Sequence, residues 1–214
     1  MEDILHQYSL PYNPKRPVVV FDERPCFLIG DVIQPIPMES GSPKLEHYEY
    51  EKHGCCTVFL AFEPLTGRRW VKVFRQRSGL EYTLFMQYLS QKFKGVEQIV
   101  LVQDNLSTHS TGSFYAHLKP SVALRLAQRF EFHFTPIKSS WLNMAELELS
   151  VLSRQCLKRR IPSMEFLERE VNAWVKARNK ARVMVKWQFS VELARVKFSA
   201  KYPLNKKKTL VLTN

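Results

Sequence analysis

The alternation of apolar and polar residues along this chain predicts five strands. The run "VVVF" at residues 18–21 is continuously apolar, which is typical of a strand buried on both faces, and Asp22 ends it. Residues 55–64 and 68–77 flank the turn "PLTG" and predict a hairpin. Residues 96–104, which end in Asp104, and residues 130–136, in which phenylalanine alternates with polar residues, predict two more strands.

Apolar residues at helical spacing predict helices between and after these strands. Residues 78–93 begin with a serine cap, and residues 120–129 form a short helical stretch. A long helix begins near Trp141 with Asn143 as its cap, and residues 163–182 are amphipathic. Residues 31–48 contain three prolines and predict a loop. This order of elements predicts a mixed α/β sheet flanked by helices.

The length and composition indicate one domain with a real core. The chain has 214 residues, and no segment approaches the roughly 18 apolar residues that a membrane-spanning helix needs. The first residues lack the pattern of a signal peptide, so the cytoplasm is the expected location. The four cysteines are irregularly spaced, which indicates reduced thiols and no disulfide framework.

The charge is unevenly distributed along the chain. Residues 1–150 hold 16 Lys or Arg against 16 Asp or Glu, whereas residues 151–214 hold 16 against 4, so the net charge of +12 comes from the last third. Such a basic block favours nucleic acid as a partner, because each phosphate that Lys or Arg neutralises releases a counterion. A solvated basic surface is the alternative.

Two carboxylates follow apolar strands and are candidates for a metal site. If the strands that precede Asp22 and Asp104 are neighbours, both carboxylates meet at one end of the sheet, where their repulsion calls for a divalent cation. Glu146 and Glu148 are candidates for a third carboxylate, and because they lie two apart on a helix only one can face the sheet. Oxygen ligands favour Mg²⁺ or Mn²⁺. Turn or cap roles for the aspartates are the alternative.

The stretches "VVVFDERP", "LVQDNLSTHS" and "HFTPIKSSWLNMAELELSVLSRQCLKRRIP" resemble the catalytic (DDE) domain of transposases of the insertion-sequence 630 family, which are related to the mariner-like transposases. The likeness runs from "PYNPKRP" to about Pro203 and so covers nearly the whole chain. "SSWLNMAELE" is its most specific part, since it resembles the block that contains the third acidic ligand of the family.

The resemblance implies a ribonuclease-H-like fold in which Asp22, Asp104 and Glu146 are the catalytic residues and the metal ligands, with Glu148 as a helix residue. The implied activity is DNA cleavage and strand transfer of an insertion element, with two Mg²⁺ or Mn²⁺ ions as cofactors. It also implies a prokaryotic protein associated with the nucleoid. Two alternatives are a stand-alone metal-dependent nuclease and a non-catalytic DNA-binding or inhibitory transposase remnant.

The resemblance implies partners as well. Double-stranded DNA, as element ends and target, is the expected substrate. Family members that act alone carry an N-terminal helix-turn-helix region, and "MEDILHQYSLP" is too short for one, so we expect either a separate helix-turn-helix chain or a truncated remnant. A homodimer is a further candidate assembly. The expected layout is a lead-in at 1–16, a catalytic core at 17–160, a basic helical part of the same domain at 161–204 and a flexible basic tail at 205–214.

Several other residues are candidates for roles near the site. The resemblance places a histidine at His109, for which a surface or capping role is the alternative, and Asn105 and Asn143 are further candidates near the site. Zinc is not expected, because His47, His53, Cys55 and Cys56 lack a second ligand pair at finger spacing. Trp141 could stack on a base or lie in the core, and the core is also expected for Trp174 and Trp187. The candidate DNA contacts are Arg154, Lys158, Arg159, Arg160, Lys176, Arg178, Lys180 and Arg182.

Overall fold

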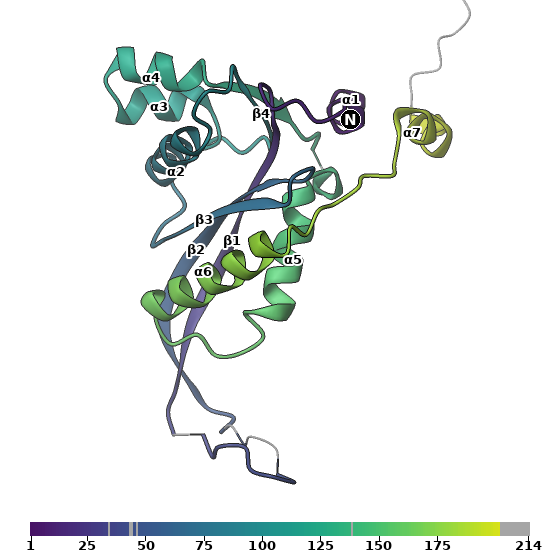
Figure 1. The fold of residues 1–214 in the computed structure, drawn as a ribbon. Helices are drawn as coiled ribbons and strands as arrows, with labels where there is room; N and C mark the ends of the chain where they lie inside the picture. Colours follow the sequence, from purple (N-terminus) through teal and green to yellow (C-terminus); the bar gives the residue numbers. More distant parts are fainter. Residues whose placement is uncertain (34, 43–44, 46, 138, 202–214) are drawn as a thin grey trace, which may run out of the picture.

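The five expected strands form one mixed sheet in the computed structural model, which describes residues 1–33, 35–42, 45, 47–137 and 139–201 (Figure 1). Their spatial order is β3-β2-β1-β4-β5; β1 pairs antiparallel with β2 and parallel with β4, and β4 pairs parallel with β5. The neighbouring positions of β1 and β4 confirm the condition on which the carboxylate site depends. The strands are β1 (Val18–Asp31), β2 (Tyr50–Glu63), β3 (Arg68–Phe74), β4 (Ile99–Gln103) and β5 (Phe130–Phe134).

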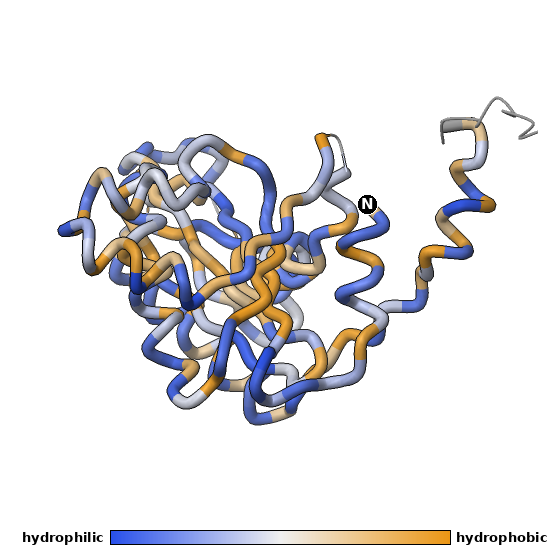
Figure 2. The backbone as a smooth tube through the Cα atoms, turned by 90° about the horizontal axis from the view of Figure 1, so that it is seen from above, coloured by the Kyte–Doolittle hydropathy of each residue, from blue (hydrophilic) through white to orange (hydrophobic). Residues whose placement is uncertain are grey.

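Helices cover both faces of this sheet and create two cores (Figure 1). Alternate residues of β1 enter opposite cores: Phe21 packs with Tyr82 and Phe85 of α2, whereas Val20 lies in the core that α5 and α6 cover. Figure 2 shows the same arrangement, with hydrophobic central strands surrounded by more hydrophilic segments. The helices are α1 (Glu2–Ser9), α2 (Gly79–Lys92), α3 (Thr111–His117), α4 (Pro120–Ala127), α5 (Met144–Gln155), α6 (Met164–Lys180) and α7 (Val191–Lys197), with 3₁₀ turns at Ser140–Leu142 and Ser199–Lys201.

The expected helix starts are confirmed by their caps. The Ser78 hydroxyl accepts a hydrogen bond from the amide of Leu80, and Glu81 accepts one from the amide of Ser78, so α2 begins with a reciprocal capping box. Asn143 caps α5 by accepting a hydrogen bond from the amide of Ala145 at 3.1 Å. None of the helices in the described ranges is long and apolar enough to span a bilayer.

The expectation that Asp22 ends its strand is wrong. β1 continues to Asp31, because it pairs with β2 as a long two-stranded ribbon from Val20–Phe62 to Asp31–Tyr50. Its pairing with β4 stops at Val20, and beyond that point no strand in the described ranges pairs with this edge of β1, although the amide of Ile29 donates to the carbonyl of Ile161 at 2.7 Å. Pro25, which has no amide hydrogen to donate, is tolerated on this edge. α1, α3 and α7 were not expected, and the predicted tail at 205–214 lies outside the described residues.

Candidate active site

Asp22 and Asp104 lie on adjacent strands at matching positions. The parallel register pairs Val20 of β1 with Val102 of β4, and each aspartate follows two residues later, one within β1 and one directly after β4. Glu146 lies in the first turn of α5, which crosses the same region of the sheet. Asp22 and Glu146 both line a pocket of about 400 Å³, together with Arg154 and the β1 residues Glu23, Arg24 and Pro25.

The start of α5 is tied directly to the residue before Asp22. The side-chain amide of Asn143 donates a hydrogen bond to the carbonyl of Phe21 at 2.9 Å while its oxygen caps the helix. The hydroxyl of Tyr8 in α1 donates to the carbonyl of Leu142 at 2.8 Å. Asn143 therefore holds α5 against β1, which places Glu146 and Asp22 in the same pocket.

Negative charge is concentrated at this point of the sheet. The pKa of Asp22 is raised to about 7, mainly by burial and in smaller part by the nearby charges of Glu23, Asp104 and Glu146, while the amide of Glu23 opposes the shift by donating a hydrogen bond. The three expected ligands are thus within electrostatic range of one another. Ionisation of a carboxyl group with such a raised pKa is costly, and a cation bound beside it would lower that cost.

His109 is not a surface or capping residue, because its side chain is 1% exposed. Its Nδ1 is hydrogen-bonded to Asp104, and its Nε2 lies 3.0 Å from Glu23 Oε2, close enough for an ion pair although the alignment is not that of a hydrogen bond. Burial lowers the pKa of His109, but the two carboxylates outweigh it and bring the pKa to about 9. The imidazolium consequently joins Asp104 to Glu23.

A shell of further side chains fixes this imidazole. The ring of Tyr82 stacks on His109 at a centroid distance of 4.9 Å, and its hydroxyl donates to Gln103 Oε1 at 2.9 Å. Gln103 Nε2 in turn donates to the carbonyl of His109 at 2.8 Å, and Arg77 lies 3.5 Å from Glu23. The sequence prediction did not include Glu23, Arg77, Tyr82 or Gln103. The only sequence signal for Glu23 was its place next to Asp22.

The carboxylates suit hard divalent cations in type and charge. Asp22, Asp104 and Glu146 supply only oxygen, and the charges of Asp104 and Glu146 add to burial in raising the pKa of Asp22. Among the described residues no three acidic, histidine or cysteine side chains converge closely enough to surround a single ion. Burial raises the pKa of Asp104, but His109 and Arg77 lower it more, so this carboxylate stays ionised and interacts with His109.

Glu146 and Glu148 have different environments, as their spacing predicted. Glu148 is 2% exposed and accepts hydrogen bonds from Arg69 Nε at 2.7 Å and Arg178 Nη2 at 2.9 Å. Arg69 is fully buried and also donates to the carbonyls of Gly67 and Val183. Glu148 thus anchors α5 to β3 and α6, and only Glu146 faces the pocket with Asp22.

The candidate DNA contacts divide into two groups. Arg154 lines the pocket with Asp22 and Glu146, whereas Arg178 is 14% exposed and its guanidinium is paired with Glu148. Arg159 and Arg160 pair with Glu170 and Asp31. Exposed members without a carboxylate partner in the described ranges are Arg154, Lys158, Lys176, Lys180 and Arg182.

The other residues singled out from the sequence lie away from this pocket or have structural contacts. Asn105 is exposed beside Asp104. Trp141 is 42% exposed and packs on Phe189 and Trp187, and Trp174 is in the core that α5 and α6 cover. The four cysteines are unbridged, and His53 is hydrogen-bonded to the carbonyl of Pro162, so nothing in the described part of the chain supports a zinc site.

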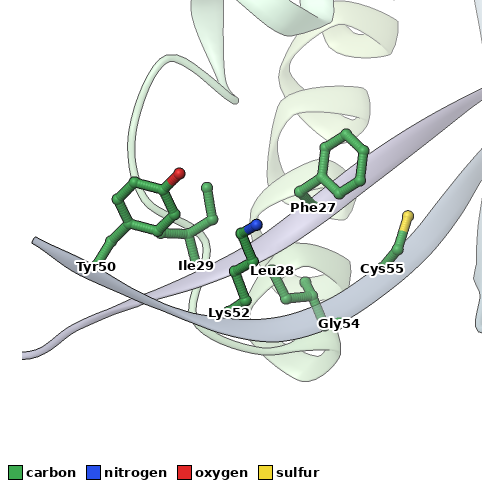
Figure 3. Close-up of a pocket in the computed structure, with 7 residues that line it drawn as sticks. All are labelled: Phe27, Leu28, Ile29, Tyr50, Lys52, Gly54 and Cys55. Atoms are coloured by element: carbon green, nitrogen blue, oxygen red, sulfur yellow. The ribbon is translucent and has the colours of Figure 1, made fainter.

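Another pocket, on the outer part of the β1–β2 ribbon, lacks catalytic groups (Figure 3). It has a volume of about 470 Å³, and Phe27, Ile29, Tyr50 and Lys52 project from one face of the ribbon into it. Phe27 is 70% exposed. This pocket contains no carboxylate, so it does not compete with the Asp22 pocket as a site for phosphodiester chemistry.

Comparison with known proteins identifies related folds. The family model of DDE superfamily endonucleases matches residues 17–168. Similar solved structures include three of Mos1 mariner: the paired-end complex with Mn (14% identity, TM-score 0.57, covering 85% of this chain and 54% of that chain), the strand transfer complex (14%, 0.57, 85% and 53%) and the paired-end complex with Mg (15%, 0.55, 85% and 54%). This chain spans just over half the length of those proteins. They confirm the expected ribonuclease-H-like α/β fold. No curated protein sequence matched.

Proposed function

Since this chain belongs to the DDE superfamily of endonucleases, we propose that it is the catalytic domain of a transposase, which cleaves DNA at the ends of an insertion element and joins the freed ends to a target. The observation that carries this proposal is the grouping of Asp22, Asp104 and Glu146 at one point of a ribonuclease-H-like sheet. The Mos1 complexes with paired ends and after strand transfer support DNA as the partner.

In the proposed mechanism, Asp22, Asp104 and Glu146 would hold two Mg²⁺ or Mn²⁺ ions. When bound, such ions supply an activated water or 3′-hydroxyl and neutralise charge that develops at the phosphate. Mos1 has been crystallised with either metal, which supports this choice. Water attacks the phosphodiester at the element end, and the freed 3′-hydroxyl then attacks the target strand. No side chain needs to form a covalent bond with DNA.

The residues around the ligands position DNA and carboxylates. Arg154 projects from α5 into the pocket, where a guanidinium holds a phosphate oxygen next to Glu146. His109 keeps the Asp104 carboxylate oriented and ionised, and Asn143 fixes α5 relative to β1. These contacts preorganise the site, so that little rearrangement is needed when the phosphate is attacked.

Metal-dependent cleavage of a DNA duplex that carries element ends tests this function. We expect cleavage with Mn²⁺ or Mg²⁺ that Asp104→Asn and Glu146→Gln each abolish while DNA binding persists. Glu97→Gln is a matched control, because it makes the same change at an exposed carboxylate paired only with Lys15. Cleavage followed by joining of the ends to a second DNA supports the transposase, cleavage without joining indicates a nuclease, and binding without cleavage by the wild-type chain contradicts the proposal.

A further inference from the structure

A basic pocket lies near the end of β2 that leads into β3. It is separate from the pocket that contains Asp22 and Glu146. It has a volume of about 700 Å³ and is formed by the β2–β3 turn, the chain that leaves α6 and the segment before β1. Its lining includes two arginines, Arg68 and Arg182, and two aromatic residues, Tyr12 and Trp70. Leu60 pairs with Asp22 and Glu63 with Arg68, so the pocket begins roughly 10 Å along the sheet from the catalytic aspartate.

The two arginines have donors available for a ligand. Both are exposed, and within the described residues neither has a carboxylate within ion-pair distance, unlike Arg69 and Arg178 beside them. Glu63 is 1% exposed and hydrogen-bonded to Thr66, and its charge interacts with that of Arg68 without forming an ion pair with either guanidinium. An anion that enters the pocket would meet two unpaired guanidinium groups.

The backbone around Arg182 is held in a strained but fixed conformation. Arg182 has φ +48°, in the left-handed region that glycine or asparagine adopts more easily, directly after the end of α6. The turn packs so closely that a Cβ on Gly67 would lie 2.7 Å from the carbonyl carbon of Arg182. The amide of Val185 donates to the carbonyl of Pro64 at 3.2 Å, and Arg69 donates to the carbonyl of Val183 at 2.7 Å. The chain that leaves α6 is therefore fixed against the β2–β3 turn (Figure 1).

An arginine in this conformation is best explained by what its side chain binds. The left-handed turn itself would be more stable with glycine or asparagine, so the strain at Arg182 points to a functional reason for the larger side chain. The fixed backbone presents the Arg182 side chain to the same pocket as Arg68. Two guanidinium groups in a preorganised pocket are suited to a phosphate.

We propose that this pocket binds an unpaired DNA strand, with Arg68 and Arg182 on a backbone phosphate and the rings of Tyr12 and Trp70 against a base. This proposal extends the proposed function, since it takes DNA as the substrate. Tyr12 is 47% exposed, and the Trp70 ring packs against the ring of Phe93 at a centroid distance of 4.8 Å. An unstacked base can reach such rings, whereas the bases of an intact duplex are already stacked on each other.

Fluorescence anisotropy with a labelled single-stranded oligonucleotide, and with its duplex, in EDTA tests the proposal. We expect Arg68→Gln/Arg182→Asn to weaken single-strand binding about tenfold and to reduce the slope of log Kd against log salt by about 0.7, because the two arginines bind one phosphate and each neutralised phosphate contributes about 0.7. Asparagine is chosen because it tolerates the left-handed backbone. Lys119→Gln/Arg125→Gln, on and beside α4, removes the same charge and should leave the slope nearly unchanged.

A second pair of variants separates stacking from charge. Tyr12→Leu should weaken single-strand binding about tenfold and duplex binding much less, whereas Tyr12→Phe, which keeps the ring, should bind like wild type. Any of three results would overturn the proposal. The two charge-removing double variants could lose the same single-strand affinity, or a variant could lose the same affinity for single strand and duplex. The third is that Tyr12→Leu and Tyr12→Phe bind single strand equally. No cleavage occurs in EDTA, so this result is independent of whether the carboxylate site is active.

Discussion

At the scale of single residues, Asp22 carries the largest electrostatic cost in the site. Burial and three neighbouring carboxylates raise its pKa from 3.8 to about 7. A raised pKa means that the stability contribution of Asp22 is fully present below its unfolded pKa and is lost as the pH rises toward 7. In the absence of metal, Asp22 therefore contributes least to the stability of the folded state at neutral and higher pH.

We predict that Asp22→Asn stabilises the metal-free protein at high pH and not at low pH. In EDTA near pH 8 the variant should be more stable by roughly 2–4 kcal/mol, with almost no difference near pH 4, because the neutral amide avoids the cost of ionisation. Urea unfolding at both pH values measures this. Mn²⁺ should raise the Tm of the wild type and not of the variant; an Asp22→Asn chain that is less stable at both pH values would refute the electrostatic account.

His109 contacts Asp104, the second of the proposed metal ligands, and Glu23 lies on the other side of the imidazole. The imidazole contacts Asp104 through one nitrogen and lies 3.0 Å from Glu23 at the other. We predict that Glu23→Gln and His109→Asn each weaken Mn²⁺ binding by about 10- to 100-fold, as is usual when partners that orient a metal ligand are changed. Calorimetric Mn²⁺ titration of each variant measures the effect independently of cleavage.

A double-mutant cycle shows whether these two residues act in series. If Glu23 acts through the imidazole, Glu23→Gln should add little in a chain that already carries His109→Asn. Fully additive losses would instead mean that Glu23 contributes only its charge. Urea midpoints within about 0.5 M of the wild type would exclude a general loss of folding, since stability changes appear as shifts of the midpoint.

At the scale of secondary-structure elements, the orientation of α5 depends on a buried ion-pair network. Glu148 is paired with Arg69 of β3 and Arg178 of α6, and these groups are 2%, 0% and 14% exposed. The side chain of Asn179 pairs with both the amide and the carbonyl of Arg69 at 2.9 Å, which closes the free edge of β3. The network thus fixes α5, the helix that carries Glu146, to β3 and α6.

We predict that Glu148→Leu destabilises the fold by about 3–5 kcal/mol, because it leaves two buried guanidinium groups without a counterion. Replacing all three partners, as Arg69→Met/Glu148→Leu/Arg178→Leu, should recover much of that loss, since an apolar cluster needs no pairing. Urea unfolding gives both values. A triple variant no more stable than Glu148→Leu would contradict the explanation by unpaired charge.

The sequence predicts the regular elements where apolar periodicity and turn or cap residues agree. Ser78, Asn143 and the "PLTG" turn all mark element boundaries that the structure confirms. The full length of β1 could not be predicted, because residues 23–31 are stabilised by pairing with β2 and by other contacts that depend on the tertiary fold, such as the hydrogen bond from the amide of Ile29 to the carbonyl of Ile161. α3 contains few apolar residues, among them the buried Phe114, and so gives no helical periodicity.

The candidate site was predictable only in part, for a similar reason. Asp22 and Asp104 follow apolar runs, and the resemblance selects Glu146 over Glu148, so the sequence proposes these three residues as ligands, and the structure places both Asp104 and Glu146 within electrostatic range of Asp22. Glu23, Tyr82 and Arg77 join the site through contacts between β1, α2 and the loop after β4, which no local pattern reveals. The buried pairing of Arg178 is equally invisible, because its neighbours in sequence are exposed basic residues.

At the scale of the whole molecule, the positive charge lies on the side of the sheet that carries the carboxylates. The basic last third includes α6, which lies with α5 over the core that contains Val20, and α7, which contacts α1, and Arg154 of α5 opens into the Asp22 pocket. Part of this charge is neutralised internally, by Glu148, Glu170 and Asp31. The remaining exposed groups favour a DNA duplex lying across α5 and α6.

We predict that Arg154→Gln/Lys176→Gln/Lys180→Gln weakens duplex binding and lowers its salt dependence. Each lost phosphate contact should reduce the slope of log Kd against log salt by about 0.9, so the triple variant should lose between one and three contacts. Anisotropy titrations of a labelled duplex in EDTA, at several salt concentrations, measure the slope.

The matched control is Lys94→Gln/Lys119→Gln/Arg125→Gln, which removes the same charge from exposed positions after α2 and on and beside α4. Its effect should be limited to a small change in Kd with an unchanged slope, because long-range attraction is screened beyond about 10 Å at 0.1 M salt. If both triples lower the slope equally, DNA has no preferred face on this molecule. Since the carboxylates open on the α5 side, such a result would also remove the geometric basis for delivering a scissile phosphate to Asp22 and Glu146.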